Sequence, residues 1–243
     1  MRIARTIAPT GHLRAAINLG NPVLAQKDPR TGELRGVTVE LARELGRRLD
    51  VPVELVAFDA AGKVFEALQR DAWDVAFLAI DPVRAGEITF TAPYVIIEGT
   101  YLVPEASPLR AIDDLDRAGV RIVVGRGSAY DLYLTRSLAR AELVRVPTSA
   151  EAMDVFVRDR LEAAAGVKQS IVAYAGTHPG LRVIPGRFMV IEQAVGLPKA
   201  RDGAAAYVRA FVEEMKASGF VAAALAASGQ ADAAVAPASN QPR

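Results

Sequence analysis

The sequence contains one strand–helix–strand pattern twice, and the two copies lie 88 positions apart. The first copy covers residues 54–76 and the second covers residues 142–164. Each copy begins with Glu-Leu-Val, continues through an amphipathic helix to an Arg-Asp turn, and ends in an apolar strand. A repeated unit of this kind predicts two similar lobes, and a cleft between lobes is a common place for a ligand.

The composition is that of an ordinary folded protein. A chain of 243 residues can form one large or two modest domains. Hydrophobic residues make up 51% and charged residues 23%, which allows a normal core. The net charge of +1 provides no basic field for nucleic acid, so we expect no nucleic-acid partner. No run of 18 apolar residues occurs, so no membrane-spanning helix is predicted.

Several kinds of catalytic and metal site are excluded by the residues that the chain lacks. It has no cysteine, which rules out disulfides, thiol nucleophiles and thiolate metal sites. Its two histidines, His12 and His178, are too few and too far apart to suggest a zinc cluster. No serine-hydrolase elbow or metalloprotease motif is present. The sequence gives no positive support for an enzyme, and we expect no cofactor and no metal.

Apolar strands that alternate with helices predict an α/β fold. Residues 75–80 form a fully apolar strand, and residues 122–124 and 163–166 are similar strands in the second half. Such strands favour mostly parallel sheets with helices on both faces. We expect the chain to cross between lobes near Glu98 and to return within residues 189–197. The expected parts are lobe one (residues 1–97 and 192–228), lobe two (residues 98–191) and a mobile tail rich in Ala and Pro (residues 229–243).

Arg84 is the foremost candidate for binding a ligand. It follows the apolar strand 75–80 within the first turn of a helix, where Asp81 is a preferred N-cap and Pro82 a preferred first residue. Open α/β sheets bind ligands at this edge, and a guanidinium matches a carboxylate with two hydrogen bonds. Two alternatives are a solvated arginine and an ion pair with Glu87. We expect Asp81 to be a cap first and a ligand contact second.

Two positions in the second half correspond to this edge. Ser128 follows a Gly-Arg-Gly turn and precedes Asp131 by three residues, which is typical of a helix cap and also of an anion-binding helix start. Arg126 would add charge there or point into solvent. Lys168 follows the strand 163–166 and either faces the cleft or extends to its rim.

Further polar residues complete the predicted ligand-binding set. Asn18 and Asn21 end the first strand, where their amides bind ligand or satisfy a turn. Gln193, beside Glu192 in an apolar strand, lines the hinge or belongs to a solvated edge strand. The full predicted set is Arg84, Ser128, Lys168, Asn18, Asn21, Asp81, Tyr130 and Gln193.

Residues 80–94 resemble a motif of the polar amino-acid-binding family of bacterial periplasmic solute-binding proteins. The resemblance continues through residues 36–42, 124–128 and 195–199, and it covers roughly residues 10 to 228. It implies a two-lobed, type II periplasmic-binding-protein fold that closes by hinge motion. It also implies that Arg84 holds the carboxylate of the ligand and that Ser128 assists from the other lobe.

Two departures from the family pattern affect the expected ligand. Phe77, Leu78 and Ala79 replace the hydroxyl and glycine residues that usually line the segment before the arginine. Lys168, preceded by Val167, falls where amino-acid-binding members place an aspartate that holds the α-ammonium. We expect Arg84 and Lys168 to face one cleft with no matched carboxylate. Because like charges repel more strongly as a cleft loses water, we expect an organic acid, such as a dicarboxylate, aromatic acid or keto acid.

The expected protein is a monomeric periplasmic binding protein that captures a small anionic metabolite for the permease of an ABC-type importer. Because the first twelve residues lack the apolar segment of a signal peptide, a mature form, a trimmed chain and a cytoplasmic protein all stay open. One alternative is a cyclohexadienyl-dehydratase-like enzyme on the same scaffold, with Glu192 as its only candidate for a buried general acid. The other is a ligand-sensing domain.

Overall fold

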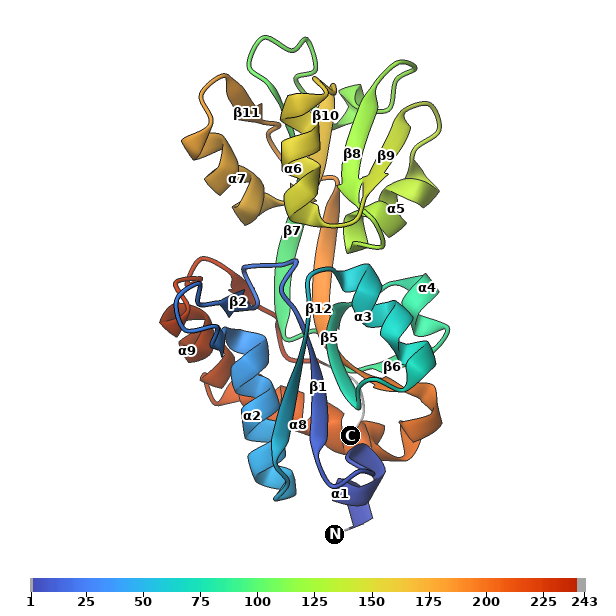
Figure 1. Cartoon of the computed structure of the whole chain (residues 1–243), viewed down its shortest axis with the longest axis vertical. Helices are drawn as coiled ribbons and strands as arrows, with labels where there is room; N and C mark the ends of the chain where they lie inside the picture. The colour runs from blue at the N-terminus through green and yellow to red at the C-terminus, as the bar shows by residue number, and fades with distance from the viewer. Residues whose placement is uncertain (1, 240–243) are drawn as a thin grey trace. The chain divides into compact units, whose positions relative to one another are not determined.

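The computed structural model describes residues 2–239, and these residues form an α/β fold (Figure 1). The chain divides into two compact units. Unit 1 comprises Met1–Ile96 and Glu192–Arg243, and unit 2 comprises Ile97–Ile191. The chain passes from one unit to the other along β7 (Val95–Pro104) and returns along β12 (Met189–Pro198).

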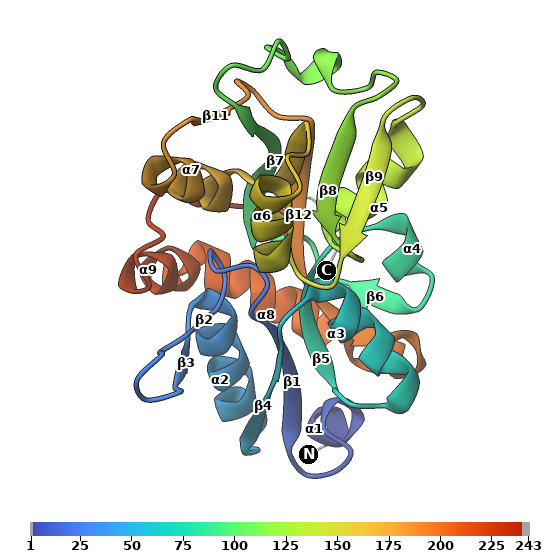
Figure 2. The same cartoon turned by 45° about the horizontal axis from the view of Figure 1, so that its top comes forward.

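Unit 1 contains a mainly parallel sheet with the strand order β4-β1-β5-β12. β1 is parallel to both β4 and β5, and β12 closes the row as an antiparallel strand. Helices α2 and α3 pack beside β1 and β4 (Figures 1 and 2). The elements of unit 1 are α1 (Arg2–Ile7), β1 (Leu13–Asn18), β2 (Gln26–Lys27), β3 (Leu34–Arg35), α2 (Val37–Leu49), β4 (Val53–Phe58), α3 (Ala61–Ala67), η1 (Leu68–Arg70), β5 (Val75–Ala79), α4 (Pro82–Ala85), β6 (Ile88–Phe90), η3 (Lys199–Ala204), α8 (Ala205–Ala217), α9 (Phe220–Ala227) and β13 (Ala234–Val235).

Unit 2 repeats the plan with the strand order β7-β10-β8-β9. β8 is parallel to β9 and β10, whereas β7 is antiparallel to β10. Helix α6 packs on β8 and β10 (Figure 1), and its Phe156 belongs to the hydrophobic core of this unit together with Ile171 of α7. The elements of unit 2 are η2 (Ile112–Asp114), β8 (Arg121–Gly125), α5 (Ala129–Ser137), β9 (Glu142–Val146), α6 (Ser149–Arg158), β10 (Ala163–Val167), α7 (Lys168–Thr177) and β11 (Leu181–Val183).

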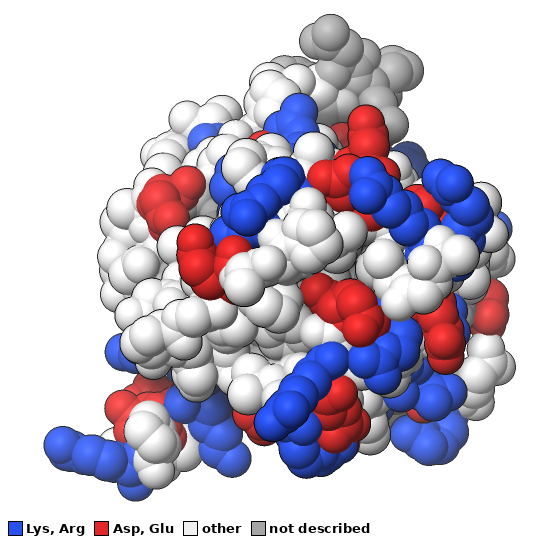
Figure 3. Space-filling model, turned by 90° about the horizontal axis from the view of Figure 1, so that it is seen from above, with Lys and Arg blue, Asp and Glu red and all other residues white. Residues whose placement is uncertain are grey.

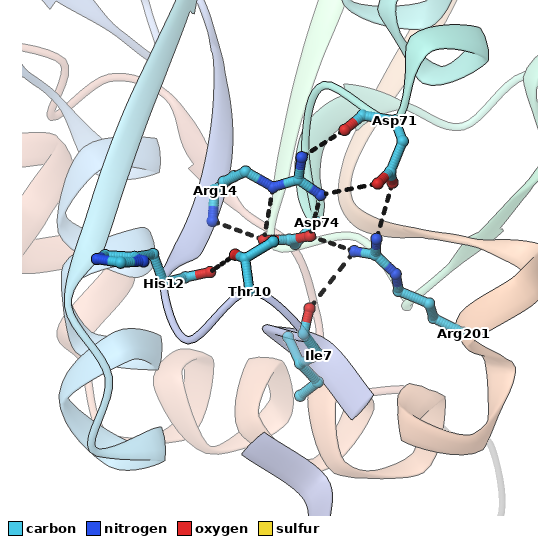
Figure 4. Close-up of polar contacts among 7 residues, drawn as sticks. All are labelled: Ile7, Thr10, His12, Arg14, Asp71, Asp74 and Arg201. Atoms are coloured by element: carbon cyan, nitrogen blue, oxygen red, sulfur yellow. Dashed lines mark hydrogen bonds and ion pairs between the residues drawn. The ribbon is translucent and has the colours of Figure 1, made fainter. Parts of the chain in front are cut away.

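The two copies of the sequence repeat form β4-α3-β5 in unit 1 and β9-α6-β10 in unit 2. The acidic residue before the final strand has the same role in both copies. Asp74 accepts hydrogen bonds from the backbone and guanidinium of Arg14, with 2.7 Å between Nη2 and Oδ1 (Figure 4). Glu162 accepts the corresponding bonds from Arg121, with 2.8 Å between Nε and Oε2. Each carboxylate therefore joins the beginnings of two neighbouring parallel strands.

The segment expected to be a mobile tail is ordered over much of its length. β13 pairs with β7, with Ala234 opposite Ile96, and both Ala233 and Ala236 are buried. The Lys216 ammonium also donates to the Pro237 carbonyl at 2.9 Å. The composition was misleading because strand pairing uses backbone groups, and alanine is small enough to be buried beside them. The last part of the predicted tail, residues 240–243, lies outside the described residues.

Two surface properties bear on possible partners. On the face drawn in Figure 3, Lys and Arg side chains are interleaved with Asp and Glu side chains, so that face carries no continuous field of one sign. Within residues 2–239, none of the helices is both long enough and apolar enough to cross a bilayer.

Candidate ligand-binding site

In unit 1, the predicted residues gather at the carboxyl ends of β1 and β5. Asn18 Oδ1 accepts the Gly20 N–H at 2.9 Å, and Asn21 Oδ1 accepts the Val23 N–H at 3.3 Å. Both asparagines thus stabilise the turn after β1, which is the structural alternative that the sequence left open. Because β1 and β5 are parallel neighbours, this turn lies at the same sheet edge as the loop that follows β5.

The loop after β5 carries Arg84 on the short helix α4. Asp81 is the N-cap of this helix, and its Oδ1 accepts the Val83 N–H at 2.8 Å. The Arg84 side chain is buried, with 1% of its surface exposed, and Nη1 donates to the Ala79 carbonyl at 2.8 Å. The interpretation of Arg84 as a solvated residue is therefore wrong. Burial lowers the pKa of Arg84 to about 10, partly opposed by the charge of Asp81, so the guanidinium stays positive at neutral pH.

The return strand β12 supplies two neighbouring polar residues with opposite environments. Gln193 is 6% exposed and pairs with Ala79 of β5, so the interpretation of this position as a solvated edge is wrong. Glu192 is exposed. A buried general acid at Glu192, which the dehydratase alternative required, is therefore absent.

Tyr94 is a buried polar residue in unit 1 that the sequence analysis did not select. Its hydroxyl is fully buried and, among the described residues, has no hydrogen-bond partner. Its ring meets Phe77 edge to face with 6.1 Å between centroids, and burial raises the pKa of the Tyr94 phenol. The signal in the sequence was its place at the end of the Phe-Thr-Ala-Pro-Tyr motif, immediately before an apolar strand.

In unit 2, Ser128 is the N-cap of α5 and is largely buried. Its Oγ accepts the Asp131 N–H at 3.1 Å, while the Asp131 carboxylate accepts the Gly127 N–H at 2.8 Å. Arg145 forms an ion pair with Asp131 through Nε and Oδ1, which are 2.8 Å apart. The predicted helix cap is therefore present, but an internal carboxylate already lies at this helix start and reduces its attraction for another anion. Arg126 is exposed to solvent.

Tyr130 lies on the first turn of α5 with only 4% of its surface exposed. Its hydroxyl forms a hydrogen bond with Ser149 Oγ at the start of α6. Burial raises the pKa of the Tyr130 phenol, and the hydrogen bond to Ser149 partly offsets that rise. Tyr130 therefore holds a proton at neutral pH and can act as a hydrogen-bond donor.

Lys168 has a partner that the sequence analysis did not find. Its Nζ is 2.9 Å from Glu98 Oε2, and Arg187 Nη1 is 2.5 Å from Glu98 Oε1. The assumption that Lys168 has no matched carboxylate is therefore wrong. The cause is the antiparallel pairing of β10 with β7, which sets Val167 opposite Gly99 and brings Glu98 beside Lys168. The available signal was one acidic residue inside an apolar strand.

Within unit 2, the parallel pairing of β8 and β10 connects these groups. Ser128 follows β8 and Lys168 follows β10, so both lie at the carboxyl edge of neighbouring strands. Each unit thus brings its own predicted residues to the sheet edge at which open α/β proteins bind ligands. Among residues 2–239, no cluster of three or more His, Asp and Glu side chains has the arrangement of a metal site.

Residues 13–240 match the sequence model of the bacterial extracellular solute-binding proteins, family 3. The chain belongs to this family. The resemblance to periplasmic solute-binding proteins and the type II α/β fold inferred from it are confirmed. A search of curated proteins gave no match.

Solved structures of this family's fold are similar over nearly the whole chain. One is the solute receptor for L-cysteine of Neisseria gonorrhoeae, with 22% identity, a TM-score of 0.80, and coverage of 93% of this chain and 92% of that one. Another is an amino acid ABC transporter substrate-binding protein from Streptococcus pneumoniae bound to L-arginine, with 20% identity, a TM-score of 0.78, and coverage of 96% and 99%.

A third similar structure is AncCDT-1, an ancestral amino acid-binding protein described as a precursor of cyclohexadienyl dehydratase. It has 22% identity, a TM-score of 0.77, and coverage of 92% of this chain and 97% of that one. At these levels of identity, the similarity of all three structures establishes the fold.

Proposed function

We propose that this solute-binding protein captures a small carboxylate-bearing solute and delivers it to the permease of an ABC-type importer. The observation that carries the proposal is Arg84, a buried guanidinium at the carboxyl edge of β5. A guanidinium held at this sheet edge can match a carboxylate with two parallel hydrogen bonds, and ligands of open α/β proteins bind at this edge. Family membership and the amino acid ABC transporter protein among the similar structures support the transport role.

The two units would contribute different parts of the ligand contact. In this proposal Arg84 of unit 1 holds the carboxylate, while the hydroxyls of Ser128 and Tyr130 of unit 2 donate further hydrogen bonds. Ligand binding would favour the closed state of the protein to the extent that the ligand binds the closed state more tightly than the open one. The other proposed contacts are Lys168, Asn18, Asn21, Asp81 and Gln193.

Delivery to an importer requires the protein to be on the outer side of the cytoplasmic membrane, so we propose a periplasmic location. The proposed acting form is a monomer, because a single chain supplies both units. Detection of the protein in a periplasmic extract of its source bacterium tests the location, and recovery only with the cytoplasm would contradict it.

The experiment that tests carboxylate binding combines mass spectrometry with one variant. Ligand that is carried through purification is released by denaturation and identified, and a panel of amino acids, dicarboxylates, keto acids and aromatic acids is screened by thermal shift. Arg84→Met should abolish stabilisation by every carboxylate that stabilises the wild type. Arg209→Met, which changes an exposed arginine on α8, is the matched control and should leave the stabilisation intact. Equal stabilisation of wild type and Arg84→Met would contradict the proposal.

A second candidate function is dehydration of a cyclic carboxylic acid. The similarity to AncCDT-1, a precursor of cyclohexadienyl dehydratase, favours it. The exposed position of Glu192 weighs against it, because a general acid in such a reaction needs a raised pKa and protection from water. Incubation of the protein with cyclohexadienyl carboxylic acids, followed by chromatography of the products, separates the two functions: recovery of an unchanged acid supports binding, and turnover supports the enzyme.

A further inference from the structure

Glu98, Lys168 and Arg187 form a compact group of charges within unit 2. The two carboxylate oxygens of Glu98 each contact one cation, Lys168 Nζ at 2.9 Å and Arg187 Nη1 at 2.5 Å. The three side chains are 29%, 42% and 53% exposed, respectively, so the group is accessible to a small solute. One carboxylate and two cations leave a local charge of about +1.

The group is positioned by the backbone on both sides of Glu98. The pairing of Val167 with Gly99 fixes Lys168, the first residue of α7, next to Glu98. The Phe188 N–H donates to the Gly99 carbonyl at 3.0 Å, which holds the segment that carries Arg187. Gly99 also lies too close to Phe188 and Met189 for a larger residue, since an added Cβ would be 2.9 Å from each side chain. The charges are therefore arranged before any solute binds.

The hydrogen bonds also keep Glu98 ionised. Lys168 and, to a smaller extent, Arg187 lower the pKa of Glu98, so the carboxylate is negative throughout the neutral range. A solute that brought its own ammonium would have to displace Lys168 from Glu98 or share Glu98 with two cations. A solute without an ammonium faces no such competition.

We propose that Lys168 serves as an internal ammonium for Glu98, so that the protein prefers carboxylates without an α-ammonium over amino acids with the same carbon skeleton. This inference rests on the proposed binding of carboxylates and identifies the class of carboxylate. It assigns Lys168 and Glu98 as residues that determine specificity. The carboxyl edge of β10, next to the strand that leads to Ser128, places them in unit 2's part of the proposed site.

The test uses pairs of ligands that differ only in the α-ammonium: L-glutamate and glutarate, L-phenylalanine and 3-phenylpropanoate, and L-leucine and 4-methylpentanoate. Dissociation constants are measured by calorimetry for the wild type and its variants. In each pair that binds, the wild type should prefer the acid without the ammonium by at least about fivefold, the factor expected for an exposed ion pair worth ~1 kcal/mol.

Three variants assign the preference to its cause. Lys168→Met leaves Glu98 with Arg187 as its remaining cation and opens Oε2 to a solute ammonium, so it should shift the preference toward the amino acid. Glu98→Gln leaves two cations without their carboxylate and should strengthen the original preference. Arg187→Met is the matched control, because it removes a cation from Glu98 while Lys168 stays, and it should keep the wild-type order. All four proteins are compared by circular dichroism to confirm equal folding.

The outcomes distinguish this inference from the function on which it rests. Tighter binding of the amino acid by the wild type, or an unchanged ratio in Lys168→Met, would overturn the role of Lys168 while carboxylate binding through Arg84 survives. If neither member of any pair binds and the broader carboxylate panel also fails, the proposed function is overturned and the inference with it.

Discussion

Arg14 presents both its backbone N–H and its guanidinium to a single carboxylate, that of Asp74. Asp74 is fully buried, and it also contacts Arg201 of η3, while the exposed Asp71 bridges the same two arginines (Figure 4). The contact brings together the beginning of β1, the residue before β5 and a segment that follows the return strand β12. In unit 2, Arg121 and Glu162 form the equivalent contact near the surface.

The first prediction concerns this buried carboxylate. Asp74→Ala should lower the free energy of unfolding by about 3–5 kcal/mol, because it leaves two arginines without their buried counter-charge. Glu162→Ala is the matched control in unit 2, and it should cost only about 1 kcal/mol because both side chains of that pair are about one-third or more exposed. Urea unfolding followed by circular dichroism measures both values. Equal losses of unfolding free energy in the two variants would show that burial of the carboxylate does not decide how much it stabilises the protein.

The second prediction concerns Gly36, the N-cap of α2. Its φ of +121° is rarely adopted by other residues, and an added Cβ would lie 2.4 Å from the Leu24 carbonyl oxygen. Gly36→Ala should therefore destabilise the protein by more than about 2 kcal/mol. Gly203→Ala is the control, because an added Cβ there meets no atom within 4 Å. Thermal unfolding measures both variants, and a neutral Gly36→Ala would contradict the close approach.

The third prediction concerns the loss of folding stability at acid pH. Hydrogen bonds from Arg47 and Arg48 lower the pKa of Glu44 to about 2 from its ordinary 4.5. Since the folded-state pKa lies below the unfolded-state value, Glu44 contributes stability above pH 4.5 and loses that contribution as the pH falls toward 2. Glu44→Gln should therefore be less stable than the wild type near pH 7 and no less stable near pH 2.

The measurement for Glu44 is urea unfolding at several pH values between 2 and 7. Glu66→Gln, at an exposed position of α3, serves as the control. Its free energy of unfolding should depend on pH in the same way as that of the wild type. If the free energy of unfolding of Glu44→Gln also fell with pH as in the wild type, the acid sensitivity would belong to other carboxylates.

The fourth prediction concerns strand β13. A chain that ends at Gln230 loses the pairing of Ala234 with Ile96 and the burial of Ala233 and Ala236. Its thermal midpoint should fall by about 2–8 °C, the range for a loss of about 1–2 kcal/mol in a protein of this size. A chain that lacks only residues 240–243 separates the effect of β13 from that of the final residues. An unchanged midpoint after the longer deletion would restore the interpretation of this segment as a tail.

The sequence by itself determined the features that depend on neighbours within a few residues. The repeat predicted β4-α3-β5 and β9-α6-β10, and the caps at Asp81 and Ser128 were readable because a capping side chain bonds to an N–H two or three positions away. Alternation of apolar strands and helices also sufficed for the fold class.

Only the tertiary structure decided the partners that come from distant parts of the chain. Lys168 meets Glu98 across 70 positions, Gln193 is buried opposite Ala79, and β13 finds its place beside β7. These contacts follow from which strands are neighbours and in which register they pair, and local periodicity does not encode either property. The charge balance at Lys168 was therefore misjudged from the sequence, although its place at the end of β10 was correct, because strand position is local and strand pairing is not.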